Sequence, residues 1–77
     1  MTEIRMPRLG EAMTEGYLIE FYKTSGDTVQ AGEPLYRVET AKSESDIEAP
    51  VTGVLTLVAE CEQEYPIGEL LATIEPS

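Results

Sequence analysis

Residues 35–50 read LYRVETAKSESDIEAP, a stretch in which two alternating segments flank a short polar turn. Before the turn, Tyr36 and Val38 are apolar at alternate positions, and Ile47 resumes the apolar pattern after it. Alternation with a period of two is typical of β-strands that bury one face. The stretch therefore predicts a β-hairpin with Lys42 at its tip.

The chain contains an internal repeat. Three short stretches match later ones: residues 16–18 match 53–55, 32–35 match 68–71, and 38–39 match 74–75. The offset is 37 for the first match and 36 for the other two, so we place a one-residue gap in a loop of the second copy. The repeat implies two half-domains, about 4–40 and 44–75, with the same strand pattern.

Six segments are rich in strand-forming residues and are separated by Gly and Pro. They are residues 3–6, 17–22, 35–40, 45–48, 53–59 and 70–74. The stretch 11–15 is too short for a stable helix and is closed by Gly16, so we expect a loop there. We predict one all-β domain over residues 1–77, a flattened β-barrel or sandwich of two four-stranded antiparallel sheets with internal pseudo-two-fold symmetry.

The apolar residues of these segments predict the core. Strand alternation and the repeat together point twelve side chains inward. They are Ile4, Leu18, Ile19, Val29, Leu35, Val38, Ile47, Val54, Leu55, Ile67, Leu71 and Ile74.

The composition excludes several classes of function. Fifteen acidic residues against five basic ones give a net charge of −10, which disfavours nucleic acid and anionic membrane surfaces and favours basic protein surfaces as partners; the charge could equally serve solubility alone. The absence of His excludes Ser-His-Asp catalysis and His-ligated metal sites, and we expect neither catalytic residues nor a metal site. A lone Cys61 fits a reducing, cytoplasmic location. No signal peptide, transit peptide or bilayer-spanning run is expected.

The hairpin resembles the lipoylation motif of 2-oxo acid dehydrogenase acyltransferase chains. In that family a strand ending in Val-Glu-Thr leads to a lysine at a turn, and a second strand runs into Ala-Pro, as residues 38–50 do here. The stretches 6–11, 16–20, 26–29 and 32–35 match further landmarks of the lipoyl domain. The resemblance implies that lipoate is attached covalently to Lys42.

The resemblance also implies roles for the residues around the lysine. Ala41 and Ser43 form the turn that presents Lys42, and the loop 8–15 is expected to lie close to the hairpin. Four residues of these segments are expected to take part in partner recognition, namely Glu39, Glu44, Glu11 and Met13.

Two departures from the family pattern stand out. The family turn is commonly Asp-Lys-Ala, whereas residues 41–43 here read AKS. Where the second half often has a Gly-Asp or Gly-Glu turn, residues 61–64 read CEQE. Recognition by a ligase or client enzyme, and the geometry of the second loop, are therefore open.

Two other functions share this fold. A biotinyl carrier is distinguished in the family by methionines on both sides of the lysine, and Ala41 and Ser43 are not methionines. An unmodified lipoyl-like domain could instead serve as an assembly or adaptor module, which would not need the hairpin motif.

The resemblance implies a carrier with no active site of its own, part of a dihydrolipoyl acyltransferase chain. Its expected partners are a lipoate ligase or lipoyl transferase, a thiamine-diphosphate dehydrogenase, an acyltransferase core that uses coenzyme A, and a flavin-dependent dihydrolipoyl dehydrogenase. The 2-oxo acid is expected to be of pyruvate, branched-chain or acetoin type. The isolated domain is expected to be a monomer, and residues 74–77 could begin a linker.

Overall fold

Short β-strands build the whole fold. The structure, a computed structural model, describes residues 1–10 and 13–76. The strands are β1 (Thr2–Arg5), β2 (Glu15–Phe21), β3 (Thr28–Val29), β4 (Pro34–Glu39), β5 (Glu44–Glu48), β6 (Gly53–Leu57), β7 (Gln63–Pro66) and β8 (Leu70–Glu75). No helix that could cross a membrane occurs in the described parts of the chain.

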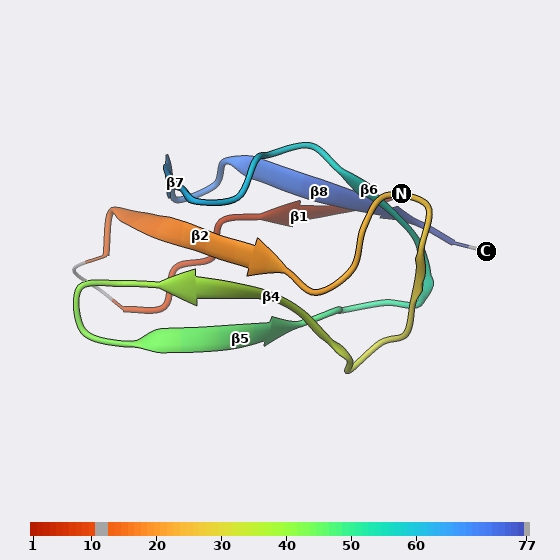
Figure 1. Cartoon of the computed structure of the whole chain (residues 1–77), viewed down its shortest axis with the longest axis horizontal. Coiled ribbons are helices and arrows are strands. Elements are labelled where there is room, and N and C mark those ends of the chain that lie inside the picture. The colour runs from red at the N-terminus through yellow and green to blue at the C-terminus, as the bar shows by residue number, and fades with distance from the viewer. Residues whose placement is uncertain (11–12, 77) are drawn as a thin grey trace.

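The strands form two four-stranded antiparallel sheets that face each other (Figure 1). The terminal sheet has the order β1-β8-β6-β3, and the hairpin sheet has the order β5-β4-β2-β7. Each sheet takes two strands from each half of the chain, which confirms the predicted all-β sandwich. The start of β1 and the end of β8 lie at the opposite end of the molecule from the β4–β5 turn (Figure 1).

The strand registers of the two halves are equivalent. Leu18 of β2 lies opposite Val38 of β4, and Leu55 of β6 lies opposite Ile74 of β8. These pairs are related by the offsets of the sequence repeat, and all four side chains are fully buried. The predicted duplication is therefore confirmed at the level of individual pairs.

The extra residue of the first half is Ile19, and placing the gap in a loop was wrong. The β2–β4 register shifts between Leu18 and Glu20, whereas the equivalent β6–β8 register continues without interruption. A β-bulge adds one residue to one strand and turns it away from the regular pattern. Ile19 is accordingly half-buried and lies outside the core cluster.

A second irregularity occurs in both halves. The β4–β5 register shifts between Pro34 and Tyr36, and the β1–β8 register shifts at the equivalent place, where Arg5 faces Leu70. Each bulge allows two consecutive residues to face inward. Leu35 and Tyr36 are thus both buried, as are the equivalent residues Leu71 and Ala72.

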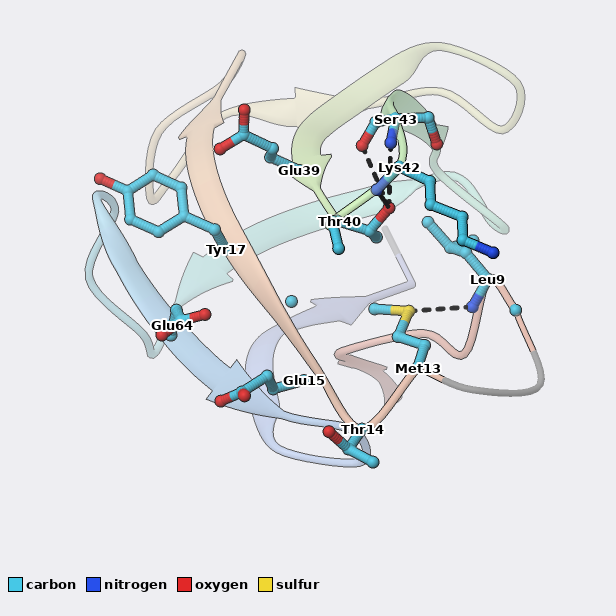
Figure 2. Close-up of a pocket in the computed structure, with 13 residues that line it drawn as sticks. Leu9, Met13, Thr14, Glu15, Tyr17, Glu39, Thr40, Lys42, Ser43 and Glu64 are labelled. Carbon is cyan, nitrogen blue, oxygen red and sulfur yellow. Dashed lines mark hydrogen bonds between the residues drawn. The ribbon is translucent and has the colours of Figure 1, made fainter.

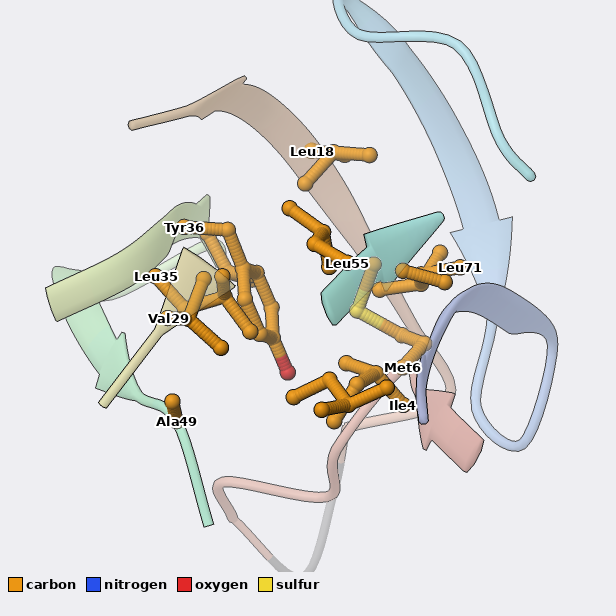
Figure 3. Packing of buried hydrophobic residues seen from close by; sticks show 12 residues of the cluster. Ile4, Met6, Leu18, Val29, Leu35, Tyr36, Ala49, Leu55 and Leu71 are labelled. Atoms are coloured by element: carbon orange, nitrogen blue, oxygen red, sulfur yellow. The ribbon is translucent and has the colours of Figure 1, made fainter. Parts of the chain in front are cut away.

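The core lies between the sheets and is entirely apolar in the described residues (Figure 3). Eight of the predicted core residues are buried, namely Ile4, Leu18, Val29, Leu35, Val38, Leu55, Leu71 and Ile74. Ile47 is half-buried against this cluster. Burial also raises the pKa of Tyr36 to about 12.

The other core predictions were wrong. Ile19, Val54 and Ile67 are half-buried outside the cluster. Val54 precedes the buried Leu55 on a regular strand, where neighbouring side chains point to opposite faces, and Ile67 lies in the turn after β7. The sequence analysis also missed four buried residues, namely Met6, Tyr36, Ala49 and Ala72.

The strands β3 and β7 were not among the six predicted segments. They occupy equivalent edges of the two sheets, and the two residues of β3 are too few to show alternation. Pro66 ends β7 and was interpreted as a break, but proline is tolerated in edge strands.

Glu62 occupies the position equivalent to Gly26. The Gly26 amide donates to the Leu55 carbonyl oxygen at 2.8 Å, and the Glu62 amide donates to the equivalent Leu18 carbonyl oxygen at 2.7 Å. Both residues have positive φ, 94° for Gly26 and 62° for Glu62. The second loop therefore keeps the geometry of the first without its glycine, although this conformation is unfavourable for a residue with a Cβ.

We predict that Glu62→Gly raises the free energy of unfolding by about 0.5–1 kcal/mol, because it removes most of the left-handed backbone penalty. Urea denaturation measures the change. Glu64→Gly is the matched control, since it removes the same charge from an extended strand position and should lower stability. A Glu62→Gly protein less stable than the wild type would contradict the backbone argument.

Candidate functional site

Lys42 lies at the tip of the β4–β5 hairpin, as predicted. Glu39 and Glu44 form the last paired positions of the two strands, and the Thr40 amide donates to the Ser43 carbonyl oxygen at 2.7 Å. Ala41 and Lys42 are both exposed at the apex of this four-residue connection.

The Thr40 side chain holds the turn. Its hydroxyl oxygen accepts from the amides of Lys42 and Ser43 at 3.4 and 3.3 Å (Figure 2). Tight two-residue hairpin turns usually require positive φ and therefore favour Gly or Asn, but neither Ala41 nor Lys42 has positive φ. The hydroxyl satisfies amides of a turn that non-glycine residues adopt without strain. The sequence analysis assigned no role to this threonine.

The two lysines of the chain differ in their surroundings. Lys23 is partly buried, and its ammonium lies 3.6 Å from a carboxylate oxygen of Glu33. Lys42 forms no ion pair within the described residues, although fifteen carboxylates are present in the chain. The amine of Lys42 is therefore accessible without breaking a salt bridge.

The first loop lies beside the hairpin, as expected from the resemblance. A groove of about 600 Å³ is lined by Leu9, Gly10 and Met13 of the first loop and by residues 39–43 of the hairpin (Figure 2). Of the residues expected to recognise partners, Met13 and Glu39 line this groove. Glu11 lies outside the described residues.

A row of polar side chains crosses the hairpin sheet at the far side of the groove. Tyr17 of β2 lies opposite Glu39 of β4 and opposite Glu64 of β7, and all three residues line the groove together with Glu15. The sequence analysis identified only Glu39 of this group. Knowing that β2 is the strand between β4 and β7 would have been needed to find the others.

Glu44 belongs to a different network on the outer surface. The Arg37 guanidinium donates to Glu44 at 2.8 Å and to Asp46 at 2.9 Å, and the Tyr22 hydroxyl donates to Asp46 at 2.6 Å. The hydrogen bond from Tyr22 lowers the pKa of Asp46, with Arg37 adding to the effect. The Glu44 carboxylate is thus engaged by a cation, whereas the Glu39 carboxylate has no hydrogen-bond partner in the described part of the chain.

Among the described residues, no group of three or more acidic, Cys or His side chains is placed to hold a metal ion. Cys61 is a half-buried free thiol between β6 and β7.

The Biotin_lipoyl family model, described as Biotin-requiring enzyme, matches residues 2–74. The chain belongs to the biotinyl/lipoyl attachment domain family. This attachment domain is 44% identical over 72 residues to the dihydrolipoyllysine-residue acetyltransferase component of the pyruvate dehydrogenase complex of Mycobacterium bovis, over 92% of this chain and 13% of the relative.

Two further relatives belong to other complexes. The acetyltransferase component of the acetoin cleaving system of Pseudomonas putida is 40% identical over 92% of this chain and 20% of its own length. The mitochondrial succinyltransferase component of the 2-oxoglutarate dehydrogenase complex of Saccharomyces cerevisiae is 38% identical over 97% of this chain and 16% of its own length. The attachment domain thus spans a fifth or less of each of these proteins.

We predict that Tyr22→Phe raises the pKa of Asp46 in this attachment domain towards its ordinary value of 3.8, because the strongest hydrogen bond to the carboxylate is lost. The carboxyl NMR signal of Asp46, followed against pH, measures the shift. A pKa lowered by folding stabilises the fold above the ordinary value, and that contribution is lost as the pH falls through the lowered one.

The variant should therefore lose stability less steeply in acid than the wild type does. Tyr17→Phe is the control, since the Tyr17 hydroxyl makes no hydrogen bond to any described residue. An Asp46 titration that is the same in Tyr22→Phe and wild type would show that the hydrogen bond does not set this pKa.

Proposed function

We propose that this domain is a swinging-arm carrier with lipoate in amide linkage to Lys42. The observation that carries the proposal is the position of this lysine, exposed and without an ion pair among the described residues at the apex of a hydrogen-bonded hairpin. The names of the three relatives, each a dihydrolipoyllysine-residue acyltransferase component, support lipoate as the group. When bound, lipoate supplies a dithiolane that carries acyl groups and electrons between enzymes.

The residues present fit such a group. An attachment lysine must present its amine to a modifying enzyme without first losing a salt bridge, and Lys42 meets this condition where Lys23 does not. The backbone amides at the turn are held by Thr40, so the lysine is presented from a fixed place. A fixed attachment point at the end of a stiff hairpin lets a ligase and several client enzymes find the same side chain.

We also infer that the domain serves a dehydrogenase, an acyltransferase core and a flavin-dependent dehydrogenase of one 2-oxo acid complex. The relatives belong to pyruvate, acetoin and 2-oxoglutarate systems, so the sequence comparisons favour this class without selecting one acid. Lys42 acts here as the attachment point and the domain as the substrate of its clients. Tethering keeps the arm at a high effective concentration at each client site.

The free carboxylate of Glu39 is the strongest candidate for partner recognition near Lys42. It is exposed beside the turn and lines the groove, so a basic patch on a client enzyme could contact it directly. Glu44, the other expected residue, would have to leave Arg37 first. We therefore rank Glu39 above Glu44 in this role.

We predict that lipoate ligase modifies Lys42 and not Lys23. In cells supplied with lipoate, intact mass spectrometry should show one lipoyl increment on the wild type and on Lys23→Arg, and none on Lys42→Arg. Lys42→Arg keeps the charge and should change the free energy of unfolding by less than about 0.5 kcal/mol, because the side chain is exposed.

A lipoyl group on the folded Lys42→Arg protein would overturn the assignment. Preferential biotin incorporation by the wild type, with biotin supplied separately, would favour the biotinyl carrier instead.

We predict that Glu39→Gln lowers kcat/KM for reductive acylation by the cognate thiamine-diphosphate dehydrogenase about 2- to 10-fold at low salt, because removing a charge near a docking surface slows association. Salt should reduce the difference. Glu75→Gln is a matched control, since Glu75 occupies the position equivalent to Glu39 in the terminal sheet. Equal effects of the two variants would assign the loss to net charge alone.

A further inference from the structure

The groove beside Lys42 has an apolar wall and an acidic one. Leu9 and Met13 lie on the side of Lys42, whereas Glu39, Glu64 and Glu15 lie on the other side (Figure 2). Leu9 is 43% exposed, and Met13 beside it is partly buried. An apolar surface is therefore left open next to the attachment lysine.

The apolar wall is held in place by specific contacts. The Leu9 amide donates to the Met13 sulfur at 3.2 Å, and the Met13 amide donates to the Gly10 carbonyl oxygen at 3.1 Å. Met13 packs against the core, directly over Gly16, where an added Cβ would lie 2.9 Å from the Met13 methyl carbon. The wall is thus anchored to β2 through Met13, and Leu9 is presented above it.

The charge of the Lys42 side chain decides whether a group attached to it can bind to this apolar wall. An ammonium group would lose hydration by lying against Leu9, which is unfavourable. Acylation of the amine replaces the charge by a neutral amide and adds an aliphatic chain. Such a chain gains free energy by leaving water for an apolar surface. Because it is tethered at the rim of the groove, even a weak contact populates the bound state.

We propose that the apolar wall formed by Leu9 and Met13 is a docking site for the acyl arm attached to Lys42. The inference rests on the proposed function, because it takes Lys42 as the attachment residue. The arm then exchanges between a docked state, in which its aliphatic part covers Leu9, and a free state that visits client enzymes. Docking shields the arm between visits and makes it leave the domain from the side of the first loop.

The test places an acyl group on residue 42 without a ligase. Nε-octanoyl-lysine is encoded at position 42 in one protein and Nε-acetyl-lysine in another; both remove the charge, but only the octanoyl group has the eight-carbon chain of lipoate. In NMR spectra we expect nuclear Overhauser effects from the octanoyl methylenes to the Leu9 and Met13 methyl groups. The acetyl protein should show none, and its Met13 methyl signal should stay near that of the unmodified chain.

Two surface variants distinguish docking at this wall from nonspecific contact with exposed apolar side chains. Leu9→Ser should reduce the octanoyl-dependent shift of the Met13 methyl signal by more than half. Val58→Ser should leave it unchanged, because Val58 is another exposed apolar side chain, 54% accessible, that does not line the groove. Both variants are expected to fold, since each replaces an exposed residue.

Octanoyl methylenes without contacts to Leu9 or Met13 would overturn the docking site. Equal shifts in the acetyl and octanoyl proteins would overturn it too, because they would assign the change to the lost charge. Neither result depends on whether a ligase modifies Lys42, so docking and attachment can fail separately.

Discussion

β1 pairs along its length with β8, and β4 pairs with β5, so each sheet of this small domain is completed by the opposite half of the chain. The buried cluster likewise contains Leu18 and Leu35 from the first half and Leu55 and Leu71 from the second. A half-domain would leave both its apolar face and its sheet edges open. Folding of the β4–β5 hairpin therefore depends on distant parts of the chain such as β7, which begins more than twenty residues after Lys42.

The same pairing explains why the lysine and the chain ends lie apart. The pseudo-two-fold axis relates β4 to β8 and β5 to β1, so the Lys42 turn corresponds to the place where the two ends of the chain meet. Rotation about this axis puts the turn and the ends at opposite extremes of a molecule 36 Å long (Figure 1). A chain joined to either end would leave from the side away from Lys42, which fits the proposed role of this lysine.

The sequence predicted those features that recur in both halves. The repeat identified Leu35 with Leu71 and Val38 with Ile74, and all four are fully buried. Alternation also identified the hairpin, because β4 and β5 are regular next to the turn. For the site, the resemblance correctly placed the first loop beside the hairpin, whereas the proposed attachment of lipoate depends on chemistry that no backbone pattern reveals.

The predictions failed where the backbone departs from regular pairing. A bulge moves Ile19 out of the core, and another lets the adjacent Leu35 and Tyr36 face inward together. Neither bulge changes the local composition in a way that alternation could detect. The large Tyr36 and the small Ala72 occupy equivalent positions and are both buried, a difference in size that the repeat does not reveal. The roles of Thr40 and Tyr17 were missed for a similar reason, since they depend on turn hydrogen bonds and on which strands are neighbours.

The chain has a net charge of −10, yet Lys42 forms no ion pair among the described residues. The structure explains why. Glu44 is the first carboxylate after the turn, and Arg37 engages it from the neighbouring strand at 2.8 Å. Asp46 is engaged by the same guanidinium and by Tyr22. An exposed ion pair contributes little to stability, so the more important effect of Arg37 is that it occupies carboxylates that could otherwise approach the lysine. Arg37 therefore contributes to keeping Lys42, the proposed attachment residue, accessible, although it lies five residues before Lys42 in the chain.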